Sequence, residues 1–239
     1  MDDQEEPLRG GEADEEESLF TPRVWIVVDP RERVEECGCA LFELESAAMH
    51  PGLAIVVLWI GWAVSWFAAA AWSNRTEKSV GLRKEAGYRL VLAVGGILFA
   101  VPAHGYDGVL RLWHVDAGAA WICVAAIAAG FAFCWWARVH LGRLWSGKIT
   151  KKQDHHVVDT GPYRIVRHPI YTGILLAVIA TMAAKGTVLG ILGGALLWVG
   201  LWMKARMEET WLRQELGPDA YDAYRRRVPM LVPFGPKGK

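Results

Sequence analysis

The sequence predicts an all-α fold, a multi-pass transmembrane helical bundle of about five spans with a small cytoplasmic part at its carboxyl-terminal end. Two observations predict this fold. First, 53% of the 239 residues are hydrophobic, and they gather in runs near the length of about 20 residues with which a helix crosses a bilayer. Second, basic residues concentrate in alternate connections between these runs, which is the pattern that orients multi-span membrane proteins.

The formal net charge of zero conceals a division of the chain. Residues 1–45 hold 15 acidic and 4 basic side chains, which leaves 11 acidic and 22 basic ones for residues 46–239. We expect residues 1–50 to form an acidic, largely disordered segment, because they cannot bury enough apolar surface to fold. A solvated tail is the simpler interpretation, and a partner-binding arm is the alternative. The first apolar run starts near residue 52, behind this acidic stretch, which argues against a cleavable signal peptide.

The four cysteines do not predict a disulfide framework. Cys123 and Cys134 lie 11 residues apart in one apolar run, so on a single helix they cannot meet. Cys37 and Cys39 form a C-x-C pair in the acidic segment, where metal or redox use is one interpretation. No second cluster completes a zinc set. We therefore interpret the pair as incidental thiols and predict no metal site.

Five apolar runs are the candidate spans, and we expect a helix for each. The second run is short, so its helix is expected to begin before residue 88. Lys185-Gly186 leaves room only for a tight helical hairpin between the last two runs. Small residues in the last run favour close helix packing, namely Gly190, Gly193, Gly194 and Gly200. The five runs are 53–72, 90–102, 117–137, 170–184 and 187–203.

The basic residues predict the orientation of the bundle. They are numerous after the first, third and fifth spans, whereas the other two connections carry a single Arg111 and a single Lys185. This alternation places the carboxyl-terminal end in the cytoplasm and the amino-terminal end outside. We expect residues 51–137 to hold the first three spans, and residues 138–239 to hold the last two together with the polar segments. The basic run at 225–227 is expected to contact anionic lipid headgroups.

The candidate site begins in residues 155–173, HHVVDTGPYRIVRHPIYTG. Pro169 suits the first turn of a helix, where its missing N–H costs little. A helix that starts there gathers Arg167, His168 and Tyr171 at the mouth of an apolar run. Polar groups at such a position need a partner, and a bound charged ligand supplies one.

The second part of the candidate site is the charged run 204–210, KARMEET, which follows the last span. Arg167, Glu208 and Glu209 are the candidate catalytic residues. There are simpler alternatives for each. Arg167 and His168 can be positive-inside residues that contact lipid phosphate, and the Glu pair can be a solvated helix face.

These motifs together resemble the isoprenylcysteine carboxyl methyltransferase family. The resemblance covers about residues 138–234 and includes the lead-in GRLWSG at 142–147. The matching motifs are His155-His156-Val157-Val158, Gly161-Pro162-Tyr163, Arg167-His168-Pro169-Ile170-Tyr171-Thr172-Gly173, Glu208-Glu209, and the run Tyr221-Asp222-Ala223-Tyr224-Arg225-Arg226-Arg227-Val228-Pro229.

The resemblance implies S-adenosylmethionine as the cofactor. It also implies that a basic residue one turn before the Glu pair, Lys204 or Arg206, contacts substrate. No G-x-G occurs in the chain, so a soluble Rossmann-type cofactor fold is not indicated. The cofactor-binding residues that the family implies are His155, His156, Val157, Val158, Tyr163, His168, Pro169, Ile170, Tyr171 and Glu208.

The chemistry of this cofactor suits the residue types present. Its carboxylate would pair with Arg167, and Glu208 would accept from its ammonium or ribose. Aromatic faces of Tyr163 and Tyr171 tolerate its sulfonium. A carboxylate acceptor is already ionised and needs no general base, whereas an amine or thiol must lose a proton, which His168 or Glu209 could take.

The predicted function is that of an integral membrane methyltransferase with its active site facing the cytoplasm. The methyl group would pass to a lipophilic acceptor, and the family implies the carboxylate of a prenylated cysteine. The alternatives are a phospholipid, small-thiol or amine methyltransferase of the same superfamily, an NADPH-dependent sterol-type reductase, and a non-catalytic membrane protein. Membrane lipids are the expected surroundings, no nucleic acid partner is expected, and the sequence leaves the acceptor and the oligomeric state open.

Overall fold

The computed structural model describes residues 50–70, 76–79, 81–102, 110–142, 150–152 and 158–238. The chain divides into two units, Met1–Ala48 and Met49–Lys239, and the described residues belong to the second. The predictions for the acidic segment 1–50 and for the pair Cys37 and Cys39 therefore concern residues outside the described ones, apart from His50.

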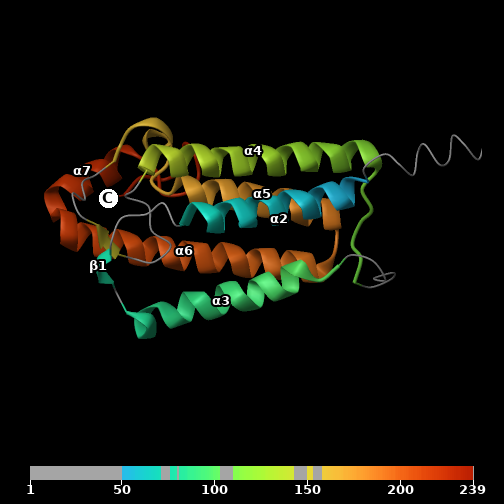
Figure 1. The fold of residues 1–239 in the computed structure, drawn as a ribbon, viewed down its shortest axis with the longest axis horizontal. Helices are drawn as coiled ribbons and strands as arrows, with labels where there is room; N and C mark the ends of the chain where they lie inside the picture. The colour runs from blue at the N-terminus through green and yellow to red at the C-terminus, as the bar shows by residue number, and fades with distance from the viewer. Residues whose placement is uncertain are drawn as a thin grey trace, which may run out of the picture. The chain divides into compact units, whose positions relative to one another are not determined.

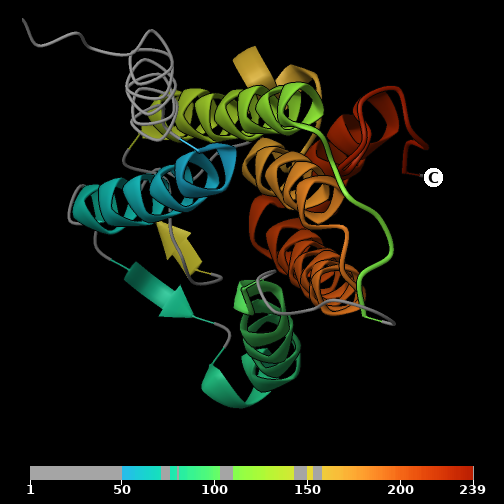
Figure 2. The same ribbon diagram turned by 90° about the vertical axis from the view of Figure 1, so that its right-hand side faces the viewer.

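Within the described residues, five long helices run side by side (Figure 1). Seen along the bundle, α3 lies against α6, and α4 lies against α5 (Figure 2). A short 3-10 helix, η2 (Gly161–Arg164), and helix α7 (Pro218–Arg227) gather at the end where α6 finishes. The five long helices are α2 (Pro51–Ala70), α3 (Leu82–Ala100), α4 (Ala117–Leu141), α5 (Pro169–Lys185) and α6 (Val188–Leu216).

Three of these helices, α2, α4 and α6, are long and apolar enough to cross a membrane. Helix α5 is apolar but shorter, at 17 residues. Helix α3 begins at Leu82, upstream of residue 88 as predicted. The prediction of a helical membrane protein is therefore confirmed, with a helix at each of the five apolar runs.

A two-stranded antiparallel ribbon interrupts the otherwise helical structure. Strand β1 (Thr76–Ser79) pairs with β2 (Thr150–Lys152), with Thr76 opposite Lys152 and Ser79 opposite Thr150. The all-α prediction missed it, because strands of three or four polar residues carry no alternation of apolar side chains. The ribbon ties the connection between α2 and α3 to the segment that leads into η2.

Helices α5 and α6 form the tight hairpin that Lys185-Gly186 predicts. Gly186 adopts the left-handed conformation with φ of 59°, and its N–H donates to the carbonyl of Met182, which is a common way to end a helix. Thr187 then caps α6 by accepting from the N–H of Gly190. Two residues therefore reverse the chain at the end of the bundle opposite to α7.

Aromatic side chains of α2 pack into the core between α4 and α5. The ring centroids of Trp59 and Trp62 each lie 5.0 Å from that of Phe131 in α4. The indole N–H of Trp59 donates to the hydroxyl of Thr181 in α5 at 3.1 Å. Other large aliphatic side chains of α2 are exposed, as expected for a helix with one face towards lipid; they are Leu53, Val56, Val57, Ile60 and Val64.

Glycine pairs allow two helix crossings to approach closely. A Cβ atom added to Gly130 of α4 would lie 2.6 Å from the carbonyl oxygen of Gly173 in α5. A Cβ added to Gly193 of α6 would overlap the backbone of Phe99 in α3. The packing role predicted for glycines of the last run is confirmed at Gly193, and also at Gly194 and Gly200, which lie against side chains of α5 and α3.

We expect Gly130→Ala to destabilise the protein by about 1–3 kcal/mol, because the backbone of α5 must move to admit a methyl group. The matched control is Gly96→Ala in α3, where an added Cβ meets nothing within 4 Å and the higher helix propensity of alanine should leave stability unchanged or slightly raised. Thermal unfolding in detergent measures both. Equal melting temperatures for the two variants would contradict the close contact of α4 with α5.

Candidate functional site

The carboxyl-terminal segment fixes the start of α5. The backbone N–H groups of Arg167 and His168 donate to the carbonyls of Pro229 and Met230 at 2.9 and 3.1 Å. The hydroxyl of Thr172 donates to the carbonyl of Leu231 at 2.6 Å. His168 is the N-cap residue of α5, and Pro169 occupies its first turn, as the sequence predicts. The segment after α7 therefore holds the Arg-His-Pro motif in place by main-chain bonds.

The guanidinium of Arg167 is engaged by the protein itself. Its Nε donates to Oε1 of Glu209 at 2.6 Å, and its Nη1 donates to the carbonyls of Arg225 and Val228 at the end of α7. Only 3% and 6% of the Arg167 and Glu209 side chains are exposed. Two of the three guanidinium nitrogens of Arg167, Nε and Nη1, therefore donate to acceptors of the protein itself. The pairing of Arg167 with a ligand carboxylate stays a prediction.

We expect Arg167→Met to destabilise the protein by about 3–5 kcal/mol, because Glu209 loses its closest partner while buried. The control is Arg227→Met, which breaks the ion pair between Arg227 and Asp159. The side chains of this pair are 65% and 39% exposed. Exposed pairs contribute less than about 1 kcal/mol. Thermal unfolding of both variants measures the two losses of stability. Similar losses would show that the buried pair stabilises the protein no more than the exposed pair does.

Glu208 is the centre of the candidate site. Its Oε1 accepts from the hydroxyl of Tyr171 at 2.6 Å, and its Oε2 lies 3.5 Å from Nδ1 of His168. The rings of His168 and Tyr171 stack with their centroids 5.4 Å apart and their planes within 4°. A carboxylate of α6 is thus joined to an imidazole and a phenol at the first turn of α5.

One nitrogen of this cluster has no hydrogen-bond partner. Nε2 of His168 is buried and lies 3.5 Å from Oε1 of Glu209, without hydrogen-bonding geometry. A buried N–H without an acceptor is unfavourable, and it marks a place where a ligand oxygen would be favoured.

Lys204 completes the cluster from α6. Its Nζ lies 3.9 Å from Oε1 of Glu208 and over the rings of Tyr171 and Tyr88, at 5.3 and 6.0 Å from their centroids. The guanidinium of Arg206, by contrast, lies over the ring of Trp202 on another side of α6. Of the two basic residues that the family resemblance left open, the structure brings only Lys204 to Glu208.

Tyr88 and Glu85 of α3 are site neighbours that the sequence analysis missed. Both side chains are buried, and Glu85 pairs with Arg89. The sequence analysis treated this stretch as a basic connection that orients the bundle. The signal that could have found the two residues is their spacing, because a carboxylate and a phenol three positions apart share one face of a helix.

The other predicted cofactor residues lie around this cluster or outside the described residues. Tyr163 is buried in η2, where its carbonyl accepts from the hydroxyl of Tyr224 at 2.7 Å and its ring stacks on His140. Pro169 and Ile170 form the first turn of α5. Val158 is described and half-buried, whereas His155, His156 and Val157 lie outside the described residues. Among the residues that the structure describes, no three His, Cys, Asp or Glu side chains are grouped to hold a metal ion.

The surroundings of His168 favour its protonated form. Burial alone lowers the pKa of the imidazole. The two nearby carboxylates of Glu208 and Glu209 favour the charged imidazole and outweigh burial, so the pKa is raised above its ordinary value. A raised pKa means that the charged imidazole stabilises the folded protein. This stabilisation is complete below the ordinary pKa of about 6.5 and is lost as the pH rises through the higher folded value.

We therefore expect wild-type thermal stability to fall, relative to that of His168→Gln, as the pH rises from about 6 to 9. The sign of this difference follows from the direction in which the pKa of His168 is shifted. Melting temperatures of both proteins, measured in the same detergent over this range, give the comparison. Parallel curves would mean that His168 does not titrate with folding.

The fold and the cluster define a helical membrane protein with a His-Tyr-Glu-Lys site where α5 and α6 meet. Residues 121–214 match the family model described as the Isoprenylcysteine carboxyl methyltransferase (ICMT) family. The predicted resemblance is thereby confirmed, and the match begins within α4, upstream of residue 138.

Individual relatives carry methyltransferase names. The chain is 32% identical to the protein-S-isoprenylcysteine O-methyltransferase of Schizosaccharomyces pombe over 103 residues. These residues cover 42% of this chain and 43% of the relative. It is 33% identical over 88 residues to protein-S-isoprenylcysteine O-methyltransferase B of Arabidopsis thaliana, 36% of this chain and 44% of the relative. It is 45% identical over 73 residues to methanethiol S-methyltransferase 2 of Bradyrhizobium diazoefficiens, 30% of this chain and 26% of the relative. The matched part thus spans less than half the length of each of these relatives.

Proposed function

We propose that this protein is an integral membrane methyltransferase that moves a methyl group from S-adenosylmethionine to a lipophilic acceptor. The observation that carries the proposal is the cluster of His168, Tyr171, Lys204 and Glu208. All four residues lie inside the region matched by the family model, whereas the neighbouring Tyr88 of α3 lies outside it. The methyltransferase names of the relatives support the same reaction class.

The residues present fit the cofactor. Glu208 offers carboxylate oxygens to an ammonium or a ribose hydroxyl, and Nε2 of His168 is a buried donor without an acceptor. The faces of Tyr171 and Tyr88 already lie beside the ammonium of Lys204, so the site accommodates positive charge next to aromatic rings. When bound, S-adenosylmethionine would supply an electrophilic methyl group on its sulfonium.

The protein's own contribution would be orientation and exclusion of water. A carboxylate acceptor is ionised at neutral pH, so no residue has to remove a proton. Lys204 is placed to pair with such a carboxylate, and the buried surroundings of Tyr171 and His168 strengthen that attraction. Holding the reacting groups together at this point accounts for the rate enhancement. The raised pKa of His168 makes its imidazole a weaker candidate for a general base at neutral pH.

A small thiol is the second candidate acceptor. The specific observation in its favour is the 45% identity to a methanethiol S-methyltransferase, although this covers only 73 residues. A thiol must lose its proton before it attacks, and the ammonium of Lys204 would stabilise the thiolate. The prenylated cysteine stands first because the positive charge of Lys204 beside the site suits an acceptor that is already an anion.

We further propose that all five helices span the bilayer, with the site on the cytoplasmic side. Helix α5 has 17 residues, or about 25 Å at 1.5 Å per residue, and runs back along α6 from the tight hairpin. Helix α3 packs along α6 in the same way, so both lie at the depth of a helix that crosses the membrane. The basic residues at the site end of the bundle support a cytoplasmic orientation. In this arrangement residues 51–137 carry three spans and residues 138–239 form the catalytic part with two.

We expect Glu208→Gln and Tyr171→Phe each to weaken binding of S-adenosylmethionine by about 1–3 kcal/mol, because each removes a charge-assisted hydrogen bond of the site. Calorimetric titration of S-adenosylmethionine and S-adenosylhomocysteine into detergent-purified protein measures the change. Arg164→Gln is the control, since this exposed side chain lies in the same segment.

Unchanged affinity in both site variants would contradict the site. Saturable binding of NADPH, without binding of S-adenosylmethionine, would instead favour the reductase alternative. A folded protein that binds neither cofactor would favour a non-catalytic role.

The acceptor is tested with Lys204→Met. For a carboxylate acceptor, we expect the KM for a farnesylated cysteine analogue to rise about tenfold or more, because a charged contact is lost, while affinity for S-adenosylhomocysteine changes little. Methyl transfer to methanethiol by the wild-type protein, with none to the prenylated analogue, would replace the carboxylate by the thiol and leave the methyltransferase proposal standing.

A further inference from the structure

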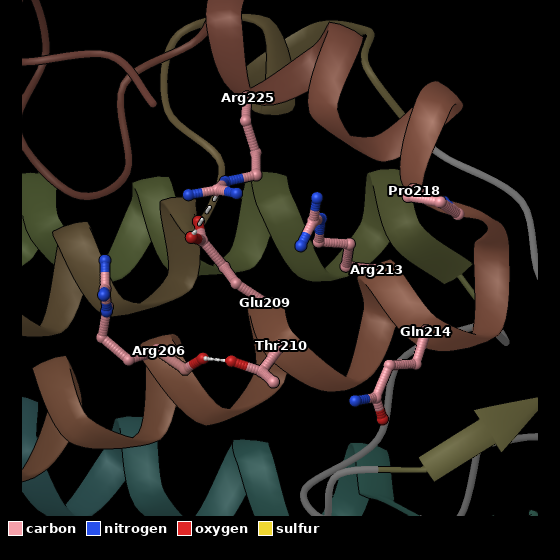
Figure 3. A pocket seen from close by; sticks show the side chains of 7 residues that line it. All are labelled: Arg206, Glu209, Thr210, Arg213, Gln214, Pro218 and Arg225. Atoms are coloured by element: carbon pink, nitrogen blue, oxygen red, sulfur yellow. Dashed lines mark hydrogen bonds and ion pairs between the residues drawn. The ribbon is translucent and has the colours of Figure 1, made fainter. Parts of the chain in front are cut away.

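A second polar site lies beside the candidate active site, in the angle between α6 and α7. It is a cleft of about 640 Å³. Figure 3 shows Arg225 extending from α7 towards Glu209 of α6, and Arg213 extending from α6 towards α7. Its lining is rich in hydrogen-bond donors and contains three arginines. The lining residues are Arg206, Glu209, Thr210, Arg213, Gln214, Pro218 and Arg225.

The cleft carries more positive than negative charge. Arg206 and Arg213 lie on one face of α6, at positions i and i+7, and Arg225 reaches in from α7. The nearby carboxylates are already shared. Asp222 pairs with Arg213 at 2.7 Å and with Arg225 at 3.2 Å. Glu209 pairs with Arg167 at 2.6 Å through Oε1, and its Oε2 lies 3.7 Å from Nε of Arg225.

Two of the arginines have donors to offer a ligand. Nε of Arg225 is buried without a hydrogen-bond partner, and Oε2 of Glu209 lies 3.7 Å from it. The guanidinium of Arg206 lies over the ring of Trp202, 6.0 Å from its centroid, and in the described part of the chain no salt bridge involves this guanidinium. A buried guanidinium N–H at the wall of a cleft is satisfied by an anion that enters the cleft.

The cleft is distinct from the candidate active site. Successive residues of a helix are turned by about 100°, so Lys204 and Glu208 face α3 and α5, whereas Arg206 and Arg213 face α7. Glu209 forms the wall between the two, because one of its oxygens contacts Arg167 and the other faces Arg225.

The position of the cleft along α6 places it at the membrane surface. The apolar run of α6 ends at Met203, and Trp202 is 46% exposed, as is typical of aromatic residues at the interface between lipid and water. Arg206 follows one turn later and packs on that indole. Its guanidinium thus lies at the level of lipid headgroups.

We propose that the cleft of Arg206, Arg213 and Arg225 is a binding site for a phosphate-type anion, either the phosphodiester of an anionic lipid headgroup or free phosphate. Planar guanidinium groups bind phosphate oxygens through paired N–H donors, and the headgroup region presents such oxygens at the depth of Arg206. This inference is independent of the proposed methyl transfer, since it uses another face of α6.

The test compares two double variants that each remove two positive charges. Arg206→Gln with Arg213→Gln removes two positively charged side chains from the lining of the cleft. Arg226→Gln with Arg227→Gln is the matched control, because Arg226 and Arg227 are exposed on α7 outside the cleft lining. They measure the general headgroup contact expected of the basic run 225–227, as distinct from binding in the cleft. Each pair also contains one arginine that is bonded to an exposed or half-buried aspartate, Asp222 or Asp159.

Binding is measured in neutral detergent in two arms. Native mass spectrometry counts retained phosphatidylglycerol against phosphatidylcholine, and thermal unfolding is followed during titration with inorganic phosphate. We expect wild-type affinity for the anion to fall about tenfold or more in the cleft variant and less than about threefold in the control. Preference for phosphatidylglycerol identifies a headgroup site, whereas protection by phosphate without lipid preference identifies a free-anion site.

Equal losses in the two double variants would reduce the effect to general surface charge and overturn the proposal, as would unchanged binding in the cleft variant. If the double variant fails to fold, Arg206→Gln alone decides the matter, because no salt bridge in the described part of the chain depends on this exposed residue. Unchanged binding in that folded single variant would also overturn the proposal.

Discussion

The buried ion pair between Arg167 and Glu209 is the interaction on which the polar end of the bundle depends. It joins the residue before the N-cap of α5 to the polar carboxyl-terminal part of α6, and through two carbonyls it also holds the end of α7. A buried charge is stable only when it is paired and hydrogen-bonded, and the planar guanidinium permits few arrangements of three acceptors. His168 and Glu208 are the chain neighbours of this pair, so its geometry sets theirs.

Helix α6 carries the candidate active site and the arginine cleft on different faces, because successive residues of a helix point in different directions. One face presents Lys204 and Glu208 to the aromatic rings of α3 and α5. Another presents Arg206 and Arg213 to α7. Both lie just beyond the apolar part of the helix, where a lipophilic molecule with a polar end would place that end. The proposed active site and the proposed anion site therefore lie at the same level of α6, just beyond its apolar part.

Much of the fold could be predicted because it follows from local features. Runs of apolar residues predict the helices, Lys185-Gly186 predicts the hairpin, and Pro169 predicts where α5 begins. The ribbon of β1 and β2 could not be predicted, since its short polar strands are stabilised by pairing between residues 71 to 76 positions apart and not by a local pattern. Tyr88 was missed for a related reason, because nothing near it in the sequence shows that its ring lies beside Lys204.

The sequence by itself determined that this is a helical membrane protein with a motif of the isoprenylcysteine carboxyl methyltransferase family, because apolar length and motif spacing are properties of the chain. Only the tertiary structure decided which partners the charged residues contact. It directs Arg167 to Glu209 and to main-chain carbonyls, it brings Lys204 and not Arg206 to Glu208, and it draws α3 into the site. The physical reason is that a charge near the membrane takes whichever partner the packing of distant helices places within reach, and neighbours in sequence do not specify that partner.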